Sequence, residues 1–203
     1  IFVIPSNDDT LITITTNGYI TEWDLSNQMM ITESSLNMSI VELACNTTNQ
    51  FVILNDNKEL YLVNKQEVTN DMEKIELNDN NQNGINNIFF QNNTLFVVYS
   101  DGVIEQKSLD ASPNEKQWKQ VHSTKSFNGN AAVSDNGNVI LVPETNQVQM
   151  LYLHSDEIKI DNLDIKNLST CTIHNNKSGG GIDCLIGDES GNVYMYLNYQ
   201  MKA

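Results

Sequence analysis

The stretch that decides the fold is Asn17-Gly-Tyr-Ile-Thr-Glu-Trp-Asp24, a tight-turn dipeptide followed by a short strand of mixed apolar and polar residues. An apolar run, Leu11 to Ile14, stands directly before it. Asn-Gly tolerates the positive φ that a two-residue hairpin turn requires, and apolar runs flanking such a turn are a strong local hairpin signal. The stretch therefore predicts a β-hairpin whose second strand is Tyr19 to Asp24.

Four further strands repeat this pattern and align with Tyr19 to Asp24 without gaps: Glu59 to Asn64, Val103 to Ser108, Gln147 to Tyr152 and Asn192 to Leu197. Their second positions are all apolar and lie 40, 44, 44 and 45 residues apart: Ile20, Leu60, Ile104, Val148 and Val193. The turn residues before them are Asn17-Gly18, Asn57-Lys58, Asp101-Gly102, Asn146 alone and Ser190-Gly191. A fixed period of this length indicates a repeat architecture.

Each repeat contains more than this one strand. A nearly continuous apolar run precedes every turn, as expected of a central strand buried on both faces: 11 to 14, 51 to 54, 95 to 99, 139 to 142 and 184 to 186. An earlier strand opens each unit, at 1 to 4, 40 to 44, 88 to 90, 131 to 133 and 170 to 173. A more polar strand closes the first four, at 29 to 33, 73 to 77, 118 to 122 and 158 to 163.

Four strands per repeat make the blade of a β-propeller. The sequence therefore predicts an all-β propeller of about five four-stranded blades, with the last incomplete. The approximate bounds of the blades are 1-35, 38-79, 85-124, 128-164 and 168-198, within one propeller domain over 1-203 that we expect to be part of a larger propeller. A β-sandwich also uses short, evenly spaced strands, but it does not require the same internal order in every unit.

The first unit resembles a WD repeat, because Trp23-Asp24 ends its third strand as the signature dipeptide of that family does. The last unit, from Gly187 to Tyr196, is similar in its turn and third strand. Departures are clear: the chain has no Gly-His dipeptide, and the positions matching Trp23 are Val63, Lys107, Leu151 and Tyr196. The resemblance is to a degenerate WD40-like β-propeller, in which the family's His-centred hydrogen-bond network cannot form. It implies a rigid scaffold that presents surfaces to other proteins, often in large complexes.

Composition narrows the range of partners and compartments. The net charge is −15, the pI is about 4.3, and all 11 basic residues are Lys, with no Arg. Nucleic-acid affinity depends mainly on Lys and Arg contacts with phosphate, so direct nucleic-acid binding is disfavoured. No apolar run approaches the ~20 residues that span a bilayer. The three cysteines form no CxxC pair, which favours a reducing compartment and an intracellular protein, cytoplasmic or nuclear.

The residues that could carry metal or acid-base chemistry are scattered. His122, His154 and His174 fall in different units at unlike places. Cys171-Thr-Ile-His174 has the spacing of half a metal site, but a structural zinc needs four ligands, and the nearby Cys184 lies in an apolar central run. We therefore expect thiols inside the sheet and histidines outside any shared site.

Two kinds of loop could hold a phosphate or a cation. Ser178-Gly-Gly-Gly181 lacks the Gly-Lys-Ser/Thr followed by a helix that a P-loop needs. Asp135-Asn-Gly-Asn138 and Asp188-Glu-Ser-Gly191 lack the alternating oxygens of a calcium loop and stand where a blade needs a turn. We expect no catalytic, metal or cofactor residues, and no cofactor.

A non-catalytic scaffold within a multiprotein complex is the favoured function, with other protein subunits as partners and no obvious homo-oligomer. Trp118, near the end of the long polar stretch Asp110 to Gln120, either packs in the core or contributes to a partner contact on the rim. Two alternatives stay open. One is an enzyme with acidic residues such as Asp101 and Asp188 in a central channel, and the other is a receptor for a peptide motif on the top face.

Overall fold

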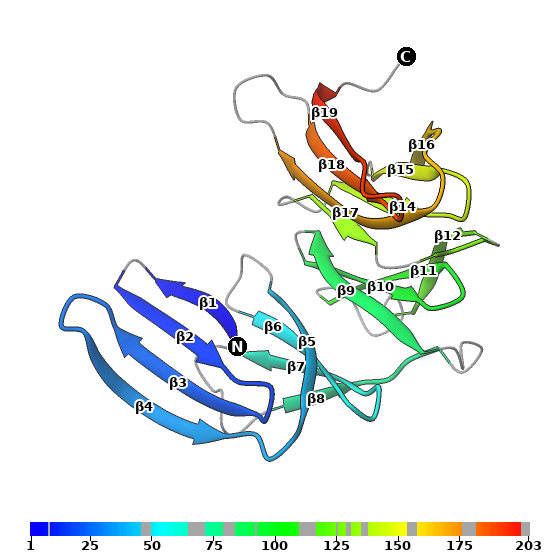
Figure 1. Ribbon diagram of the computed structural model, residues 1–203. Helices are drawn as coiled ribbons and strands as arrows, with labels where there is room; N and C mark the ends of the chain where they lie inside the picture. Colours follow the sequence, from blue (N-terminus) through cyan, green and yellow to red (C-terminus); the bar gives the residue numbers. More distant parts are fainter. Residues whose placement is uncertain are drawn as a thin grey trace. The chain divides into compact units, whose positions relative to one another are not determined.

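The structure is a computed structural model that describes residues 1–7, 9–45, 50–64, 72–78, 84–91, 93–109, 117–124, 126–128, 131–134, 138–153, 158–175 and 182–199. All regular secondary structure in these residues is β-strand (Figure 1). The chain divides into two compact units, Ile1–Asn81 and Gln82–Ala203. They are called unit 1 and unit 2 below, and each is described by itself.

Unit 1 contains two four-stranded antiparallel sheets in which the strands follow one another in chain order. The first consists of β1 (Phe2–Asn7), β2 (Thr10–Ile14), β3 (Tyr19–Asp24) and β4 (Met29–Ser35). The second consists of β5 (Ile40–Cys45), β6 (Gln50–Asn55), β7 (Leu60–Asn64) and β8 (Met72–Ile75).

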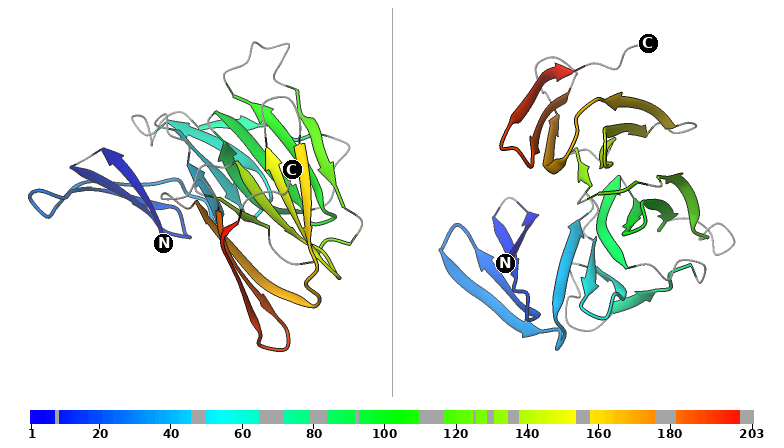
Figure 2. Two further views of the ribbon diagram at one scale, coloured as in Figure 1. Left: turned by 90° about the horizontal axis from the view of Figure 1, so that it is seen from above. Right: turned by 45° about the vertical axis from the view of Figure 1, so that its right-hand side comes forward.

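Unit 2 contains three sheets with the same order, and their strands can be followed from green to red in Figure 2. The first consists of β9 (Ile85–Gln91), β10 (Thr94–Tyr99), β11 (Val103–Ser108) and β12 (Lys119–Ser123). The second consists of β13 (Ala132–Val133), β14 (Val139–Pro143), β15 (Val148–Leu153) and β16 (Ile158–Leu163). The third has three strands, β17 (Leu168–Asn175), β18 (Ile182–Asp188) and β19 (Val193–Tyr199).

The five sheets confirm the predicted all-β fold class, and the described residues of the last sheet form three strands where the others have four. Two first strands start earlier than predicted, β9 at Ile85 and β17 at Leu168. One outer strand starts later, because β12 begins at Lys119 and leaves Trp118 just outside it. That the two units belong to one propeller domain stays a prediction.

The turn between the second and third strands has the same backbone conformation in most of the sheets. Its last residue takes a positive φ in four sheets: +83° at Gly18 and Gly102, +84° at Gly191 and +64° at Lys58. The fifth turn, around Asn146, is shorter by one residue, since Glu144 N donates to Gln147 O at 2.8 Å. Neither Thr145 nor Asn146, the central residues of this turn, has a positive φ, so the turn needs no glycine.

The core of unit 1 lies between its two sheets. The side chains that form it point to one face of their strands, as the period of two requires: Ile4, Ile12, Ile14 and Ile20 from the first sheet, Leu36 just after β4, and Ile40, Phe51, Ile53 and Val63 from the second sheet. In β6 the alternate residues Val52 and Leu54 are buried as well. Degenerate repeats of this kind are therefore held together by apolar packing between neighbouring sheets.

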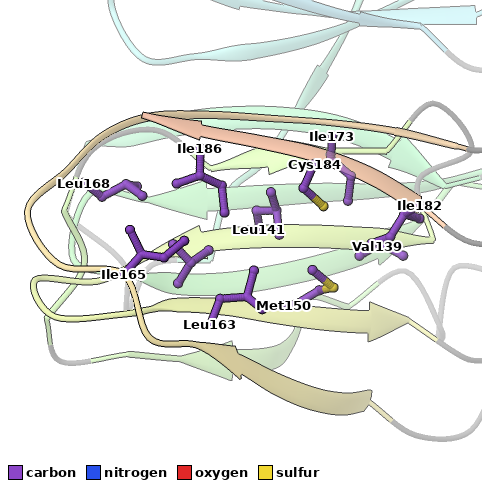
Figure 3. Packing of buried hydrophobic residues seen from close by; sticks show 11 residues of the cluster. Val139, Leu141, Met150, Leu163, Ile165, Leu168, Ile173, Ile182, Cys184 and Ile186 are labelled. Carbon is purple, nitrogen blue, oxygen red and sulfur yellow. The ribbon is translucent and has the colours of Figure 1, made fainter. Parts of the chain in front are cut away.

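Among the described residues of unit 2, one such core lies on each side of its middle sheet. Ile140 and Val142 of β14 pack with residues of the β9–β12 sheet, among them Phe96 and Ile104. Val139 and Leu141, the alternate residues of β14, pack with residues of the β17–β19 sheet in the cluster drawn in Figure 3. β14 is thus a central strand that is buried on both faces.

Candidate functional site

Trp118 lies directly before β12 and is half-buried. Lys107, near the end of the neighbouring strand β11, places its Nζ 5.4 Å from the centroid of the Trp118 ring. The two strands pair antiparallel with a register irregularity between Ile104 and Glu105. A cation at this distance from an indole is attracted by the negative face of the ring. The predicted contact residue is therefore held against β11 while part of its ring stays accessible, and residues 110–116 lie outside the described residues.

Trp23, the other tryptophan, lies beside a cavity that the sequence did not predict. Its indole Nε1 donates to Thr13 Oγ1 at 2.9 Å, and Trp23 is opposite Leu11 in the β2–β3 register. The cavity has a volume of about 290 Å³ and is lined by Leu11, Thr13, Trp23, Asp24, Leu25 and Gln28. Trp23 remains 38% exposed. Because the Trp23–Thr13 bond fixes the indole on the sheet, this wall of the cavity is preformed.

The β3–β4 turn forms the other wall of the cavity. Asp24 accepts hydrogen bonds from Asn27 N at 2.9 Å and from Asn27 Nδ2 at 2.8 Å. The backbone bond, followed by the side-chain bond, lowers the pKa of Asp24 from its usual value, so the carboxylate is the stable form near neutral pH. Gln28 has a φ of +56°, and Ser26 Oγ donates to Asp9 Oδ1 at 3.1 Å. These bonds fix the shape of the turn.

The structure does not bring the described histidines together. His122 lies on β12, where burial lowers its pKa, and its Nε2 has no hydrogen-bond partner. His174 is exposed on β17, in the strand itself and not in a loop. His154 lies outside the described residues. The two described histidines belong to different sheets, β9–β12 and β17–β19.

Cys171 and His174 lie on opposite faces of β17, since they are three residues apart in a strand. Cys171 packs against the core shared by the last two sheets, whereas His174 is exposed. Cys184 is fully buried in the same core. Burial raises the pKa of Cys171 to about 11 and that of Cys184 to about 12. Both are therefore neutral thiols near pH 7, as is typical of cysteines packed in an apolar core.

The aspartates of the acidic turns accept hydrogen bonds from the backbone of the same turns. Asp188 accepts hydrogen bonds from Ser190 N, Asn192 N, Asn192 Nδ2 and Tyr194 OH, at 2.8 to 3.2 Å. Asp101 Oδ1 accepts from Val103 N at 3.1 Å. The Asp188 segment is thus a turn, as predicted. Asn138 is described, but 135–137 and 176–181 lie outside the described residues, so the other two candidate loops remain predictions.

Two carboxylates that sequence reasoning missed are buried in unit 2. Glu105 accepts a hydrogen bond from Tyr99 OH at 3.0 Å. Glu144 accepts one from Thr124 Oγ1 and another from Gln147 Nε2 at 2.6 Å. Nothing in the sequence around them distinguishes them from outward-facing acidic residues. Their partners satisfy the buried oxygens, which indicates a structural role.

Within the described residues, no three His, Cys, Asp or Glu side chains are grouped so that they could hold a metal ion. No helix in that part of the chain is long and apolar enough to cross a membrane.

Comparison with known proteins supports the fold through structure alone. No family model and no curated protein matches the chain. The WD40 domain of Toxoplasma gondii coronin matches with a TM-score of 0.65 at 10% identity, over 96% of this chain and 54% of that one. PorZ, a bacterial surface component of the type-IX secretion system of Porphyromonas gingivalis, matches with a TM-score of 0.59 at 11% identity, over 96% of this chain and 26% of that one.

The chain thus spans about half and about a quarter of the lengths of these two proteins. In all, 1197 chains of known structure match, so the fold by itself selects no partner or pathway. The likeness to a WD40 domain and the consecutive antiparallel sheets together confirm the resemblance seen in the repeats: this chain has the fold of a degenerate WD40-like β-propeller.

Proposed function

We propose that the chain is a non-catalytic protein–protein interaction scaffold and a subunit of a larger multiprotein complex. The observation that carries this proposal is Trp118, a partly buried indole held on a sheet by Lys107. Tryptophan is enriched among the residues that dominate binding energy at protein interfaces. Because its position is fixed before binding, little conformational entropy is lost when a partner covers it.

An enzyme is the main alternative, and the acidic turns give it little support. Asp101 and Asp188 were its candidate residues, and both accept hydrogen bonds from their own turns. A carboxylate that accepts four hydrogen bonds, as Asp188 does, is stabilised in its charged form and is a weak general base. A receptor for a short peptide motif in the central channel or on the top face is the second alternative.

The partners that fit this proposal are other proteins inside the cell, in the cytoplasm or the nucleus. A net charge of −15 opposes direct binding to nucleic acid. Two thiols with raised pKa values lie in the core of unit 2 without a disulfide, in keeping with a reducing compartment.

The test is quantitative capture of a stoichiometric partner by the intact protein and by its Trp118→Ala variant. Lys119→Ala is the matched control, because Lys119 is the next residue and is exposed. We expect Trp118→Ala to lose the partner while its melting temperature stays within about 2 °C of the wild type, and Lys119→Ala to retain it. Unchanged capture with a lowered melting temperature would show that Trp118 is a packing residue and overturn its assigned role.

A further inference from the structure

The cavity beside Trp23 combines three chemical features in one place. Leu11 and Leu25 give it apolar walls, Trp23 gives it an aromatic surface, and Asp24 is the only charged residue of its lining. At about 290 Å³ it stands at the lower end of the roughly 300 to 1,000 Å³ typical of ligand pockets. A cavity of this size suits one extended side chain better than a large ligand.

The charge around the cavity has one sign. Residues 1 to 57 contain no Lys, Arg or His, and Lys58 is the first basic residue of the chain. The same stretch contains seven acidic residues: Asp8, Asp9, Glu22, Asp24, Glu33, Glu42 and Asp56. The sheet that carries the cavity therefore attracts a cation and offers it no competing basic group of its own.

We propose that this cavity binds an arginine side chain of a partner protein. The aliphatic stem of arginine packs between apolar walls while its head stays polar, its guanidinium stacks on an indole, and its planar fork of donors matches a carboxylate. Leu11 and Leu25, Trp23 and Asp24 supply these three surfaces in that order. Asn27 holds the Asp24 carboxylate at the cavity, so it need not reorganise when a cation arrives.

These 203 residues contain no arginine, so none of them can be the occupant. A second copy could insert only lysine, which is a compact, strongly hydrated charge and does not stack on an indole as a guanidinium does. The inference deepens the scaffold proposal and rests on it only in taking the partner to be a protein. Trp118 belongs to unit 2 and the cavity to unit 1, so the two proposals are tested by separate residues.

The experiment is a fluorescence titration of the Trp118→Phe variant, in which Trp23 is the only tryptophan. The probe is the blocked pentapeptide Gly-Ala-Arg-Ala-Gly, and the matched peptides carry citrulline, lysine or leucine in place of arginine. We expect a saturable change in Trp23 emission with a Kd of about 1 mM for the arginine peptide, as the small contact allows. Binding of the citrulline and leucine peptides should be at least about tenfold weaker, since both lack the charge-assisted hydrogen bonds.

Two substitutions distinguish recognition by the cavity from general attraction to an acidic surface. Asp24→Asn keeps the size of the side chain and should weaken arginine binding by about five- to tenfold. Glu33→Gln removes the same charge from an exposed position of β4 outside the cavity lining and should change binding by less than about twofold. Circular dichroism of both variants verifies that the sheets are retained.

Several outcomes would overturn the proposal. Equal binding of the citrulline peptide would show an apolar pocket without charge recognition, and equal binding of the lysine peptide would show general attraction to an acidic surface. Equal loss in Asp24→Asn and Glu33→Gln would have the second meaning. If Trp23 does not respond to the peptide and acrylamide does not quench it, the cavity is covered by another segment of polypeptide. A dimer in the same sample would identify a second copy as the cover. None of these outcomes affects the capture experiment on Trp118.

Discussion

β14 and β18 are the second strands of neighbouring sheets in unit 2, and they differ in how many faces are buried. β14 (Val139–Pro143) is buried at every residue, because one face packs on the preceding sheet and the other on the following sheet. β18 alternates: Ile182, Cys184 and Ile186 are buried, whereas Leu185 is 42% exposed. The sequences differ accordingly, with an unbroken Val-Ile-Leu-Val in β14 and Asp183, Leu185 and Gly187 at the alternate positions of β18.

The difference shows that the sequence of a second strand indicates whether its sheet is packed on one face or on both. A second strand that is enclosed on both sides is apolar at every position, whereas one with an open face tolerates polar residues and glycine at every other position. β2 in unit 1 is of the second kind, with Ile12 and Ile14 buried and Leu11 and Thr13 only partly so. The open face of β2 is the one that carries the Trp23 cavity.

The test with the largest expected effect on stability removes apolar side chains from both faces of β14 and of β18. We expect Ile140→Ala and Leu141→Ala in β14 each to reduce the free energy of unfolding by about 2 to 5 kcal/mol, because each leaves a cavity in a different core. In β18 we expect the same loss for Ile186→Ala but a change of only about 0.5 kcal/mol for Leu185→Ala. Urea denaturation of the four variants measures these changes. A Leu185→Ala variant as unstable as Ile186→Ala would show that the second face of β18 is also enclosed.

A smaller effect separates an enclosed turn from an open one. A Cβ at Gly102 would lie 2.5 Å from Thr124 Cγ2 and 2.8 Å from Phe127 Cβ, whereas a Cβ at Gly191 would have no atom within 4 Å. Both glycines have nearly the same positive φ. Gly191→Ala should therefore cost only the conformational penalty of about 1 kcal/mol, and Gly102→Ala about 3 kcal/mol, since steric overlap adds to that penalty. Equal melting temperatures of the two variants would contradict this explanation.

The smallest effect concerns the acid sensitivity of the turn after β18. Hydrogen bonds from the Asn192 side chain and then its backbone lower the pKa of Asp188 below its ordinary value. Its carboxylate therefore stabilises the folded chain above about pH 4, and this contribution is lost as the pH falls through the lowered pKa. We expect Asp188→Asn to be less stable at pH 7 and to lose less stability on acidification. Melting temperatures between pH 7 and pH 3 measure it, with Glu189→Gln, a neighbouring exposed residue, as the control that should keep the wild-type acid dependence.

Much of the fold could be predicted from the repeat. β3 and β11 have the predicted bounds, and four of the five turns have a positive φ at the predicted residue. Strand starts were predicted less well, because the first strand of a sheet has no turn residue that fixes where pairing begins. β9 begins three residues early with Ile-Asn-Asn, and its polar residues pair through the backbone as readily as apolar ones.

The candidate site could be predicted only in part. The length of the segment before Trp118 pointed to that residue, but its contact with Lys107 depends on a register irregularity that the sequence does not show. The cavity at Trp23 was missed because the Trp-Asp dipeptide already had a structural explanation. Its shape depends on the αL conformation of Gln28, a residue type that seldom adopts it.

β19 has a practical consequence for anyone who handles the isolated chain. It is the edge strand of its sheet in the described part of the chain, and Val193, Met195 and Leu197 are 70%, 61% and 67% exposed. Val193–Tyr199 contains no charge, proline or glycine, the composition typical of segments that form intermolecular β-structure. We expect concentrated samples to aggregate through this strand. A Met195→Lys substitution should slow the aggregation, because it places a charge on the exposed edge.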